Sequence, residues 1–181
     1  MNDDSPNTPP DAARLRALRG LVLDCDGVLT TGTLFYSNAG SQLLAFDARD
    51  GFALAMLCRS GVQVGVVSGR PTEIVARRMH ELGVHRVLCC GDKHAGLLRM
   101  CGDLGVPPAQ TAYVGDDLPD LGAFCHAGLA IAVADAAPEL RARADWTTSR
   151  SGGRGAVREV CEAILKARGE WERWLQQVAR P

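Results

Sequence analysis

The sequence predicts an α/β protein built on a doubly wound parallel sheet with a protruding β-hairpin, and three observations point to this fold. Short apolar runs alternate along the chain with segments of helical periodicity. Several of these runs end in acidic residues or glycine, as buried parallel strands do where they open into a turn. One pair of β-rich runs, TLFYS and QLLAF, interrupts the alternation and predicts a protruding β-hairpin at about residues 32–47.

Length and composition limit what the chain can be. Its 181 residues, 46% of them hydrophobic and 23% charged, suit one compact domain with a sizeable core. A net charge of −1 without a basic run gives no electrostatic case for nucleic acid, and no apolar stretch is long enough to cross a bilayer. The polar N-terminus MNDDSPNTPP is not a secretory signal. Seven cysteines without paired zinc spacing favour reduced thiols in a cytoplasmic protein.

The first elements lead from a polar terminus into a central strand. Residues 1–12 are expected to be disordered, and residues 13–181 to form a single domain. Asp11 is a candidate cap for a short helix that carries Leu15 and Leu18. The central strand, at 21–25, is followed by the hairpin. Because a lone apolar hairpin is marginal in water, we expect hairpins from several subunits to pack together.

The rest of the chain alternates helices and strands up to a long tail. We expect helices within residues 48–61, 72–83, 93–105, from 118 onward and at 137–144, and strands at 63–69, 85–90, 111–117, 128–133 and 145–148. Thr72 is a plausible cap of the second of these helices. The tail at about 151–178 is predicted as one long helix whose apolar stripe runs from Val157 to Leu175.

Acidic residues follow two of the apolar strands. Asp24 and Asp26 end LVLDCDG, and Asp116, Asp117 and Asp120 lie in YVGDDLPD. Open parallel sheets bind ligands at the carboxyl ends of their strands, so these acids are expected to meet there. Acids in one site repel each other and are costly to desolvate, and a cation is the simplest offset. A set of oxygen ligands favours a hard cation such as Mg²⁺, although an ordinary Asp-Gly turn and a solvated acidic turn are the alternatives.

Two further strand ends supply groups that bind phosphate. In VVSGR, the Ser68 hydroxyl and the Gly69 amide can donate to a phosphoryl oxygen, and Lys93 lies between a strand and a helix. Taken alone, Ser68 is a turn serine and Lys93 a solvated surface residue. Together with the acids they have the chemistry of phosphoryl transfer, with one carboxylate as nucleophile and a second as general acid.

This ordered set of motifs resembles the haloacid dehalogenase-like superfamily, which implies a Rossmann-like sheet. The second acid, Asp26, favours phosphoryl chemistry over dehalogenation. More narrowly, DGVLT, the hairpin, FDARDG, YVGDDLPD, AVADA and GGRGAVREVCE resemble the 3-deoxy-D-manno-octulosonate 8-phosphate (KDO 8-phosphate) phosphatases. The resemblance implies a Mg²⁺-dependent homotetramer that hydrolyses KDO 8-phosphate to KDO and phosphate through an aspartyl-phosphate, in lipopolysaccharide sugar synthesis.

The resemblance also implies a role for each matching residue. Asp24 is the expected nucleophile and Asp26 the general acid/base. Asp24, the Asp26 carbonyl and Asp116 are expected to hold Mg²⁺, with Asp117 and Asp120 as supporting acids. Phosphate contacts are expected from Ser68, Gly69 and Lys93. Substrate contacts are expected from Asp47, Ala48, Arg49, Asp50, Gly51, Arg70, Arg78 and Arg154. Arginines suit the carboxylate of a sugar acid, and a surface ion pair is the alternative for Arg49, Arg70 and Arg78.

Alternatives remain for both the substrate and the class of protein. The segment between Asp26 and Ser68 holds the hairpin and one helix but no cap domain, so neighbouring subunits must close the site. Ala55 stands where some family members carry arginine, so a nonulosonate 9-phosphate or a wider range of sugar phosphates stays open. A signalling receiver domain would carry its acids in another order, and a non-catalytic scaffold would lack a motif acid.

Overall fold

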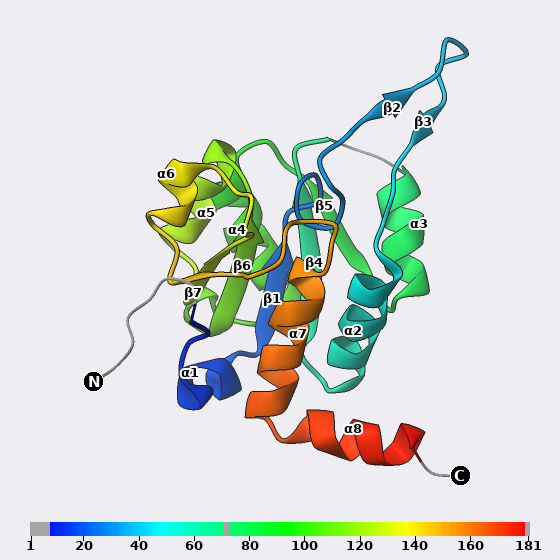
Figure 1. Ribbon diagram of the computed structural model, residues 1–181. Coiled ribbons are helices and arrows are strands. Elements are labelled where there is room, and N and C mark those ends of the chain that lie inside the picture. The colour runs from blue at the N-terminus through cyan, green and yellow to red at the C-terminus, as the bar shows by residue number, and fades with distance from the viewer. Residues whose placement is uncertain (1–7, 71–72, 180–181) are drawn as a thin grey trace.

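A parallel sheet with the strand order β5-β4-β1-β6-β7-β8 forms the centre of the molecule (Figure 1). The computed structural model describes residues 8–70 and 73–179. The strands of this sheet are β1 (Gly20–Leu23), β4 (Gln63–Ser68), β5 (Arg86–Cys89), β6 (Thr111–Gly115), β7 (Leu129–Ala132) and β8 (Trp146–Thr147). β1 pairs with β4 on one side and β6 on the other. The prediction of a doubly wound parallel sheet is confirmed.

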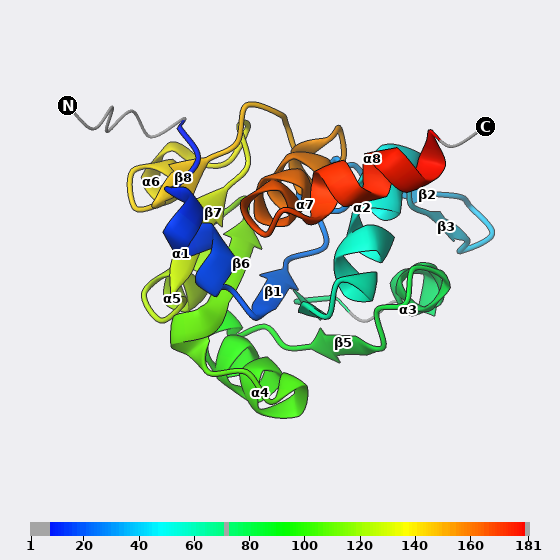
Figure 2. The same ribbon diagram turned by 90° about the horizontal axis from the view of Figure 1, so that it is seen from below.

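Helices cover both faces of this sheet (Figure 2). They are α1 (Ala12–Ala17), α2 (Ala48–Arg59), α3 (Glu73–Glu81), α4 (Lys93–Leu104), α5 (Leu121–Phe124), α6 (Pro138–Arg141), α7 (Ala156–Ala167) and α8 (Glu170–Val178), with 3₁₀ turns at Pro108–Gln110 (η1) and Leu118–Asp120 (η2). α7 packs against α1 and α2 on one face, while α4 and α5 pack together on the other. Among the described residues, no helix is long and apolar enough to cross a membrane.

The central strands are apolar because both of their faces are covered. Leu21, Val22 and Leu23 of β1 are fully buried, as are Ala112 and Val114 of β6. Continuous apolar runs of this kind are what a parallel sheet with helices on both sides requires. The acidic residues Asp24 and Asp116 follow the ends of these strands, where the chain leaves the core.

The predicted hairpin is present as a separate two-stranded antiparallel sheet, formed by β2 (Phe35–Tyr36) and β3 (Gln42–Leu43). It stands away from the body of the molecule on the side where β1 ends (Figure 1). Its turn includes Gly40 at φ 80°, a backbone conformation that glycine adopts without a steric cost. The large apolar side chains of the hairpin are exposed, with Leu43 at 68%.

Both ends of the chain differ in part from what the sequence suggested. The tail is not one long helix: α7 ends at Ala167 and α8 begins at Glu170, because Gly169 takes φ 69° and breaks the helix. Asp11 caps α1 as expected, since its side chain accepts a hydrogen bond from the Arg14 amide at 2.8 Å. Of the segment 1–12 that was predicted to be disordered, residues 1–7 lie outside the described residues, whereas Asp11 and Ala12 belong to the start of α1. The predicted Thr72 cap also lies outside the described residues.

Candidate active site

The ends of the central strands bring acids and a lysine together. Asp24 directly follows β1, Asp116 follows β6, and Lys93 is the first residue of α4. The Lys93 ammonium donates hydrogen bonds to Asp24 Oδ1 at 2.5 Å and to the Val67 carbonyl oxygen at 2.9 Å, and lies 3.5 Å from Asp120 Oδ1. Only 4% of the Lys93 side chain is exposed, so this cation belongs to the site rather than to the surface.

The loop after β1 is shaped by Asp24 and Gly27. The Asp24 amide donates to the Val114 carbonyl at 3.0 Å, which continues the β1–β6 ladder, and Asp24 Oδ1 accepts from the Cys25 amide at 2.6 Å. Gly27 takes φ 83°, and a Cβ there would stand 1.9 Å from Asp116 Oδ2. Glycine is therefore what allows this loop to lie against the Asp116 carboxylate.

Asp24 and Asp116 hold their protons more strongly than free carboxylic acids do. Burial and, after it, the charge of Asp120 raise the pKa of Asp24 from 3.8 to about 6, against the opposing effect of Lys93. Burial, together with the charges of Asp120 and Asp24, raises the pKa of Asp116 to about 7. One lysine does not offset this concentration of negative charge.

The carboxylates fit a divalent cation with oxygen ligands. Oxygen atoms of Asp24, Asp116 and Asp120 lie within 4.8 Å of one another. Asp120 is only 1% exposed, and its oxygens already accept hydrogen bonds from the Tyr113 hydroxyl at 2.8 Å and from the amides of Asp116 at 3.0 Å and Asp117 at 3.3 Å. Asp24 and Asp116 are therefore the better ligands, and Asp120 supports them. Oxygen ligands of this kind suit Mg²⁺.

Two acids of the predicted set have other partners. Asp117 is exposed and caps η2, where its side chain accepts from the Leu118 amide at 2.8 Å. The Asp26 carboxylate forms a two-point ion pair with Arg70, whose Nε and Nη2 lie 2.8 Å and 3.0 Å from its oxygens. Arg70 Nη1 also donates to the Tyr36 hydroxyl at 3.2 Å. Sequence reasoning did not select Tyr36, because nothing in a hairpin pattern signals a contact with a residue 34 positions away.

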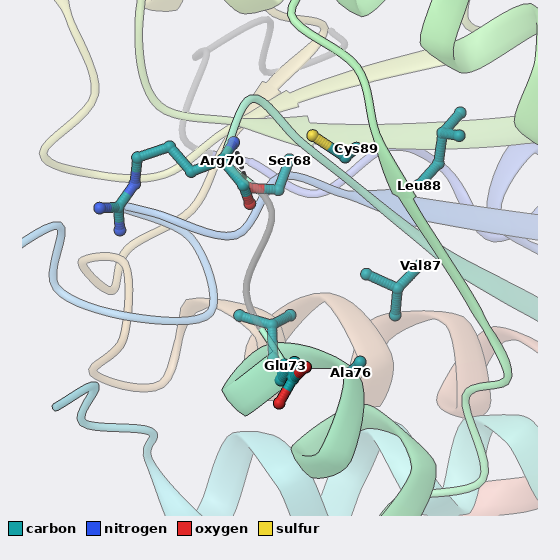
Figure 3. A pocket seen from close by; sticks show the side chains of 8 residues that line it. Ser68, Arg70, Glu73, Ala76, Val87, Leu88 and Cys89 are labelled. Carbon is teal, nitrogen blue, oxygen red and sulfur yellow. Dashed lines mark hydrogen bonds between the residues drawn. The ribbon is translucent and has the colours of Figure 1, made fainter. Parts of the chain in front are cut away.

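Ser68 lies at the end of β4, beside a pocket of about 330 Å³ between β5 and α3 (Figure 3). It is buried, and its hydroxyl donates to the Arg70 carbonyl at 3.1 Å and accepts from the Arg70 amide at 3.2 Å. Val87 and Leu88 line the pocket, and Figure 3 shows the Arg70 guanidinium pointing away from them. A Cβ at Gly69 would meet nothing within 4 Å, so the backbone after Ser68 borders open space.

The predicted substrate residues on α2 divide into surface and buried groups. Asp47 caps α2 and pairs with Arg49 at 2.8 Å, and the Arg49 side chain is 69% exposed. This contact lowers the pKa of Asp47 to about 2. Ala48 is exposed. Asp50, in contrast, is buried and faces the tail: it accepts from the amides of Gly155 at 3.1 Å and Arg158 at 2.7 Å, and so caps α7.

Arg78 lies beside the buried Gly51 and not beside the acids of the site. A Cβ at Gly51 would lie 2.4 Å from Arg78 Nη2, so the absence of a side chain there makes room for this arginine between α2 and α3. Arg78 also pairs with Glu81 at 3.1 Å on its own helix. An ion pair was the alternative considered for Arg78, and its contact with substrate stays a prediction.

The glycine-rich tail reaches the loop after β1. The Gly153 amide donates to the Val28 carbonyl at 2.8 Å, and a Cβ at Gly152 would stand 1.6 Å from the Gly27 carbonyl oxygen. Beyond these glycines, Arg154 and Arg49 line a cleft of about 350 Å³ together with Arg150, Arg158, Glu159 and Glu162. The structure therefore places Arg49 and Arg154 in one cleft, apart from the pair of Arg70 and Asp26.

Comparison with known proteins agrees with this fold and site. A model of the haloacid dehalogenase-like hydrolases matches residues 91–159. The 3-deoxy-D-manno-octulosonate 8-phosphate phosphatase KdsC of Salmonella typhimurium is 40% identical over 166 residues, which span 91% of this chain and 88% of that protein. The crystal structure of the phosphatase from Yersinia pestis has 36% identity and a TM-score of 0.87, and covers 93% of this chain and 94% of its own.

A further structure contains ligands. The 3-deoxy-D-manno-octulosonate 8-phosphate phosphatase from Moraxella catarrhalis was solved with a magnesium ion, a phosphate ion and a KDO molecule. It has 36% identity and a TM-score of 0.89, and covers 92% of this chain and 97% of its own. Fold and site together define a haloacid dehalogenase-like hydrolase. Within that superfamily, the chain belongs to the KDO 8-phosphate phosphatase (KdsC) family.

Proposed function

We propose that this chain is a Mg²⁺-dependent phosphatase that hydrolyses KDO 8-phosphate to KDO and phosphate. The observation that carries the proposal is the meeting of Asp24, Lys93 and Asp116 at one edge of the sheet, with Asp26 two residues beyond the first acid. The substrate is supported by the names of the relatives and by the KDO molecule bound in one of them. This reaction belongs to lipopolysaccharide sugar synthesis, as the sequence resemblance implied.

Asp24 and Asp26 divide the chemistry between them. The Asp24 carboxylate attacks phosphorus, and the bond from phosphorus to the sugar oxygen breaks as Asp26 gives that oxygen a proton. For this step Asp26 must first take up a proton and release one of its two contacts with Arg70. Asp26 then takes a proton from the water that attacks the aspartyl-phosphate, which releases phosphate and restores Asp24. Lys93, at 2.5 Å from Asp24, offsets the negative charge that the phosphoryl group brings to this carboxylate.

Other groups of the chain hold the phosphate and the cation. The Ser68 hydroxyl and the Gly69 amide donate to phosphoryl oxygens, for which the hydroxyl must turn from its contact with the Arg70 carbonyl at 3.1 Å. Asp24, the Asp26 carbonyl and Asp116 would hold Mg²⁺, which when bound stabilises the charge of the phosphoryl oxygens.

Recognition of the sugar acid is assigned to three arginines. Arg70 lies beside Asp26 and has a side chain that is 35% exposed, while Arg49 and Arg154 line the cleft next to the tail. A guanidinium matches a carboxylate through two parallel hydrogen bonds, which suits an anionic sugar acid. Asp50 and Arg78 act indirectly in this proposal, because their partners are α7 and α2.

We further propose that the protein is a homotetramer in the cytoplasm. The hairpin exposes Leu34, Phe35 and Leu43 at 40%, 52% and 68%, and apolar side chains of this size favour a covering surface. Packing of hairpins from neighbouring subunits supplies that surface and limits access of water to a site without a cap domain. The free cysteines are compatible with a reducing compartment.

The test is a substrate panel with purified protein and Mg²⁺. KDO 8-phosphate, a nonulosonate 9-phosphate and common hexose and pentose phosphates are compared by kcat/KM, with release of phosphate as the measurement. We expect the highest value for KDO 8-phosphate and loss of activity with EDTA, restored by Mg²⁺. A higher kcat/KM for the nonulosonate 9-phosphate would make that ester the substrate. The absence of any preference among the sugar phosphates would refute the assignment of KDO 8-phosphate.

A further inference from the structure

A tyrosine of the hairpin touches the ion pair at the proposed general acid. Arg70 Nη1 donates to the Tyr36 hydroxyl at 3.2 Å, while Nε and Nη2 of the same guanidinium hold the two oxygens of Asp26 at 2.8 Å and 3.0 Å. The three side chains come from β2, from the loop after β1 and from the turn after β4. A continuous set of contacts therefore runs from the hairpin to Asp26.

Within the described residues, not all N–H groups of the Arg70 guanidinium are engaged in these hydrogen bonds. Arginine carries five N–H groups, and three of those of Arg70 are engaged with Asp26 and Tyr36. The remaining ones lie on the terminal nitrogens, and the side chain is 35% exposed, so a ligand can reach them. Because the guanidinium is planar, the Tyr36 contact on Nη1 restricts rotation of the same plane that Asp26 uses.

The Tyr36 hydroxyl has no evident task in the fold of the hairpin. The Tyr36 ring is 62% exposed, and within the described residues Arg70 is the hydrogen-bond partner of its hydroxyl. The hairpin is held instead by backbone pairing of Tyr36 with Gln42 and, in its turn, by the Ser37 hydroxyl, which accepts from the Ser41 amide at 3.0 Å. Removing the tyrosine oxygen therefore changes the Arg70 contact and little else.

We propose that Tyr36 is a positioning residue for the phosphatase reaction: its hydroxyl fixes the plane of Arg70, and Arg70 fixes the Asp26 carboxylate that takes a proton from the attacking water. Because proton transfer is assigned to Asp26, this role rests on the proposed function. It also gives the hairpin a second task besides contact between subunits, since it links the hairpin to the acid of its own site.

The first experiment removes the hydroxyl and keeps the ring. In Tyr36→Phe we expect kcat to fall about 3- to 10-fold, the effect of losing one hydrogen bond to a charged group, with KM within about twofold of the wild-type value. Ser37→Ala is the matched control, because it removes a hydroxyl and a hydrogen bond from the same hairpin without touching Arg70, and its kcat should not change. A wild-type kcat in Tyr36→Phe would overturn the proposal.

A double-mutant cycle asks whether Tyr36 acts through Arg70. Lysine at position 70 keeps the charge but cannot form the two-point pair with Asp26. If Tyr36 acts through the guanidinium, Tyr36→Phe should lower kcat by less than about 1.5-fold in the Arg70→Lys background. A decrease of the same size in both backgrounds would show that the two residues act independently, which contradicts the proposed role.

A measurement without substrate separates this inference from the proposed function. The Nε–H signal of Arg70 can be followed by ¹⁵N NMR in the metal-free protein and assigned by its loss in Arg70→Lys. We expect its exchange with water to be about 3- to 10-fold faster in Tyr36→Phe and unchanged in Ser37→Ala, at one fixed pH. Unchanged exchange in Tyr36→Phe refutes the role of Tyr36, whereas an inactive wild type with KDO 8-phosphate refutes the substrate.

Discussion

At the scale of single residues, Asp24 is the side chain on which the chemistry depends. One of its oxygens, Oδ1, is held by the Lys93 ammonium at 2.5 Å and by the Cys25 amide at 2.6 Å. Within the described residues the other oxygen has no hydrogen-bond donor beside it. A carboxylate that is fixed through one oxygen and open at the other is suited to attack a phosphorus atom from a defined direction.

Replacement of Asp24 tests its role as nucleophile directly. In Asp24→Asn the side chain keeps its size, but an amide cannot form the aspartyl-phosphate, so we expect kcat to fall by at least about 1,000-fold. Asp103→Asn is the control, since Asp103 is an exposed acid of α4, and it should keep wild-type kcat. Phosphate release is the measurement, and turnover retained in Asp24→Asn would rule out this nucleophile.

The raised pKa values of Asp24 and Asp116 predict how stability depends on pH when no metal is bound. Both groups titrate near 3.8 when unfolded, and at about 6 and about 7 in the folded protein. At pH values between the unfolded and the folded pKa of each group, the folded protein holds protons that the unfolded chain has lost. The free energy of unfolding therefore falls as pH rises through this range. The shift at Asp24 alone corresponds to roughly 3 kcal/mol of this fall.

The measurement is urea unfolding at pH 5, 6, 7 and 8 in EDTA, repeated in Mg²⁺ at the same ionic strength. With EDTA we expect the protein to lose stability through this range. With Mg²⁺ the loss should be smaller, because the cation binds the ionised carboxylates of the folded state. Stability in EDTA that stays constant or rises from pH 5 to pH 7 would contradict the burial of these acids.

Some of these residues can be found from the sequence and others cannot, for a physical reason. Asp24, Lys93 and Asp116 stand at the ends of apolar strands, and a parallel sheet brings such ends to one edge. The contacts among Asp26, Arg70 and Tyr36 depend instead on how two loops and a hairpin fold back on each other. No local pattern encodes that arrangement, so the tyrosine is visible only in the structure.

At the scale of elements, the link between α2 and α7 is a contact that sequence reasoning did not predict. Asp50, whose contact with substrate stays a prediction, is 2% exposed and accepts hydrogen bonds from two amides at the start of α7. Its partners lie more than a hundred positions further along the chain, so only the tertiary fold reveals the contact. The break at Gly169 is similar, because the apolar stripe continues across it and hides the change of direction.

Replacement of Asp50 should therefore weaken the fold. In Asp50→Ala two part-buried amides at the start of α7 lose their acceptor, and we expect the free energy of unfolding to fall by about 2–4 kcal/mol. Asp11→Ala is the matched control, because it removes a carboxylate cap from the exposed start of α1 and should cost about 1 kcal/mol. Urea unfolding in Mg²⁺ gives both values. An Asp50→Ala protein with wild-type stability but a raised KM would instead restore the role in substrate binding.

At the scale of the whole molecule, the hairpin is the part that a single subunit leaves incomplete. It is a two-stranded sheet with exposed Phe35, Tyr36 and Leu43, and two strands alone are marginally stable in water. In the part of the chain that the structure describes, the site beneath it has no cap domain of its own. Contact between hairpins of several subunits would cover the apolar side chains and limit access to the site in one step.

The role of the hairpin in subunit assembly can be tested by placing a charge on its exposed apolar face. In the wild type we expect light scattering to give the mass of a tetramer. In Leu43→Asp the charge must either be buried in the contact or keep the subunits apart, so we expect a smaller assembly, with the circular dichroism spectrum of the subunit unchanged. The kcat/KM for KDO 8-phosphate should fall as well, because the site loses its neighbouring subunit.

Leu98→Asp is the control for this experiment. Leu98 is an apolar side chain of α4 that is 45% exposed, so the substitution adds the same charge to a surface away from the hairpin. Its mass should match that of the wild type. A monomeric wild type with full activity would mean that one subunit completes its own site and that the exposed hairpin serves another purpose. A tetrameric Leu43→Asp would place the subunit contact elsewhere on the molecule.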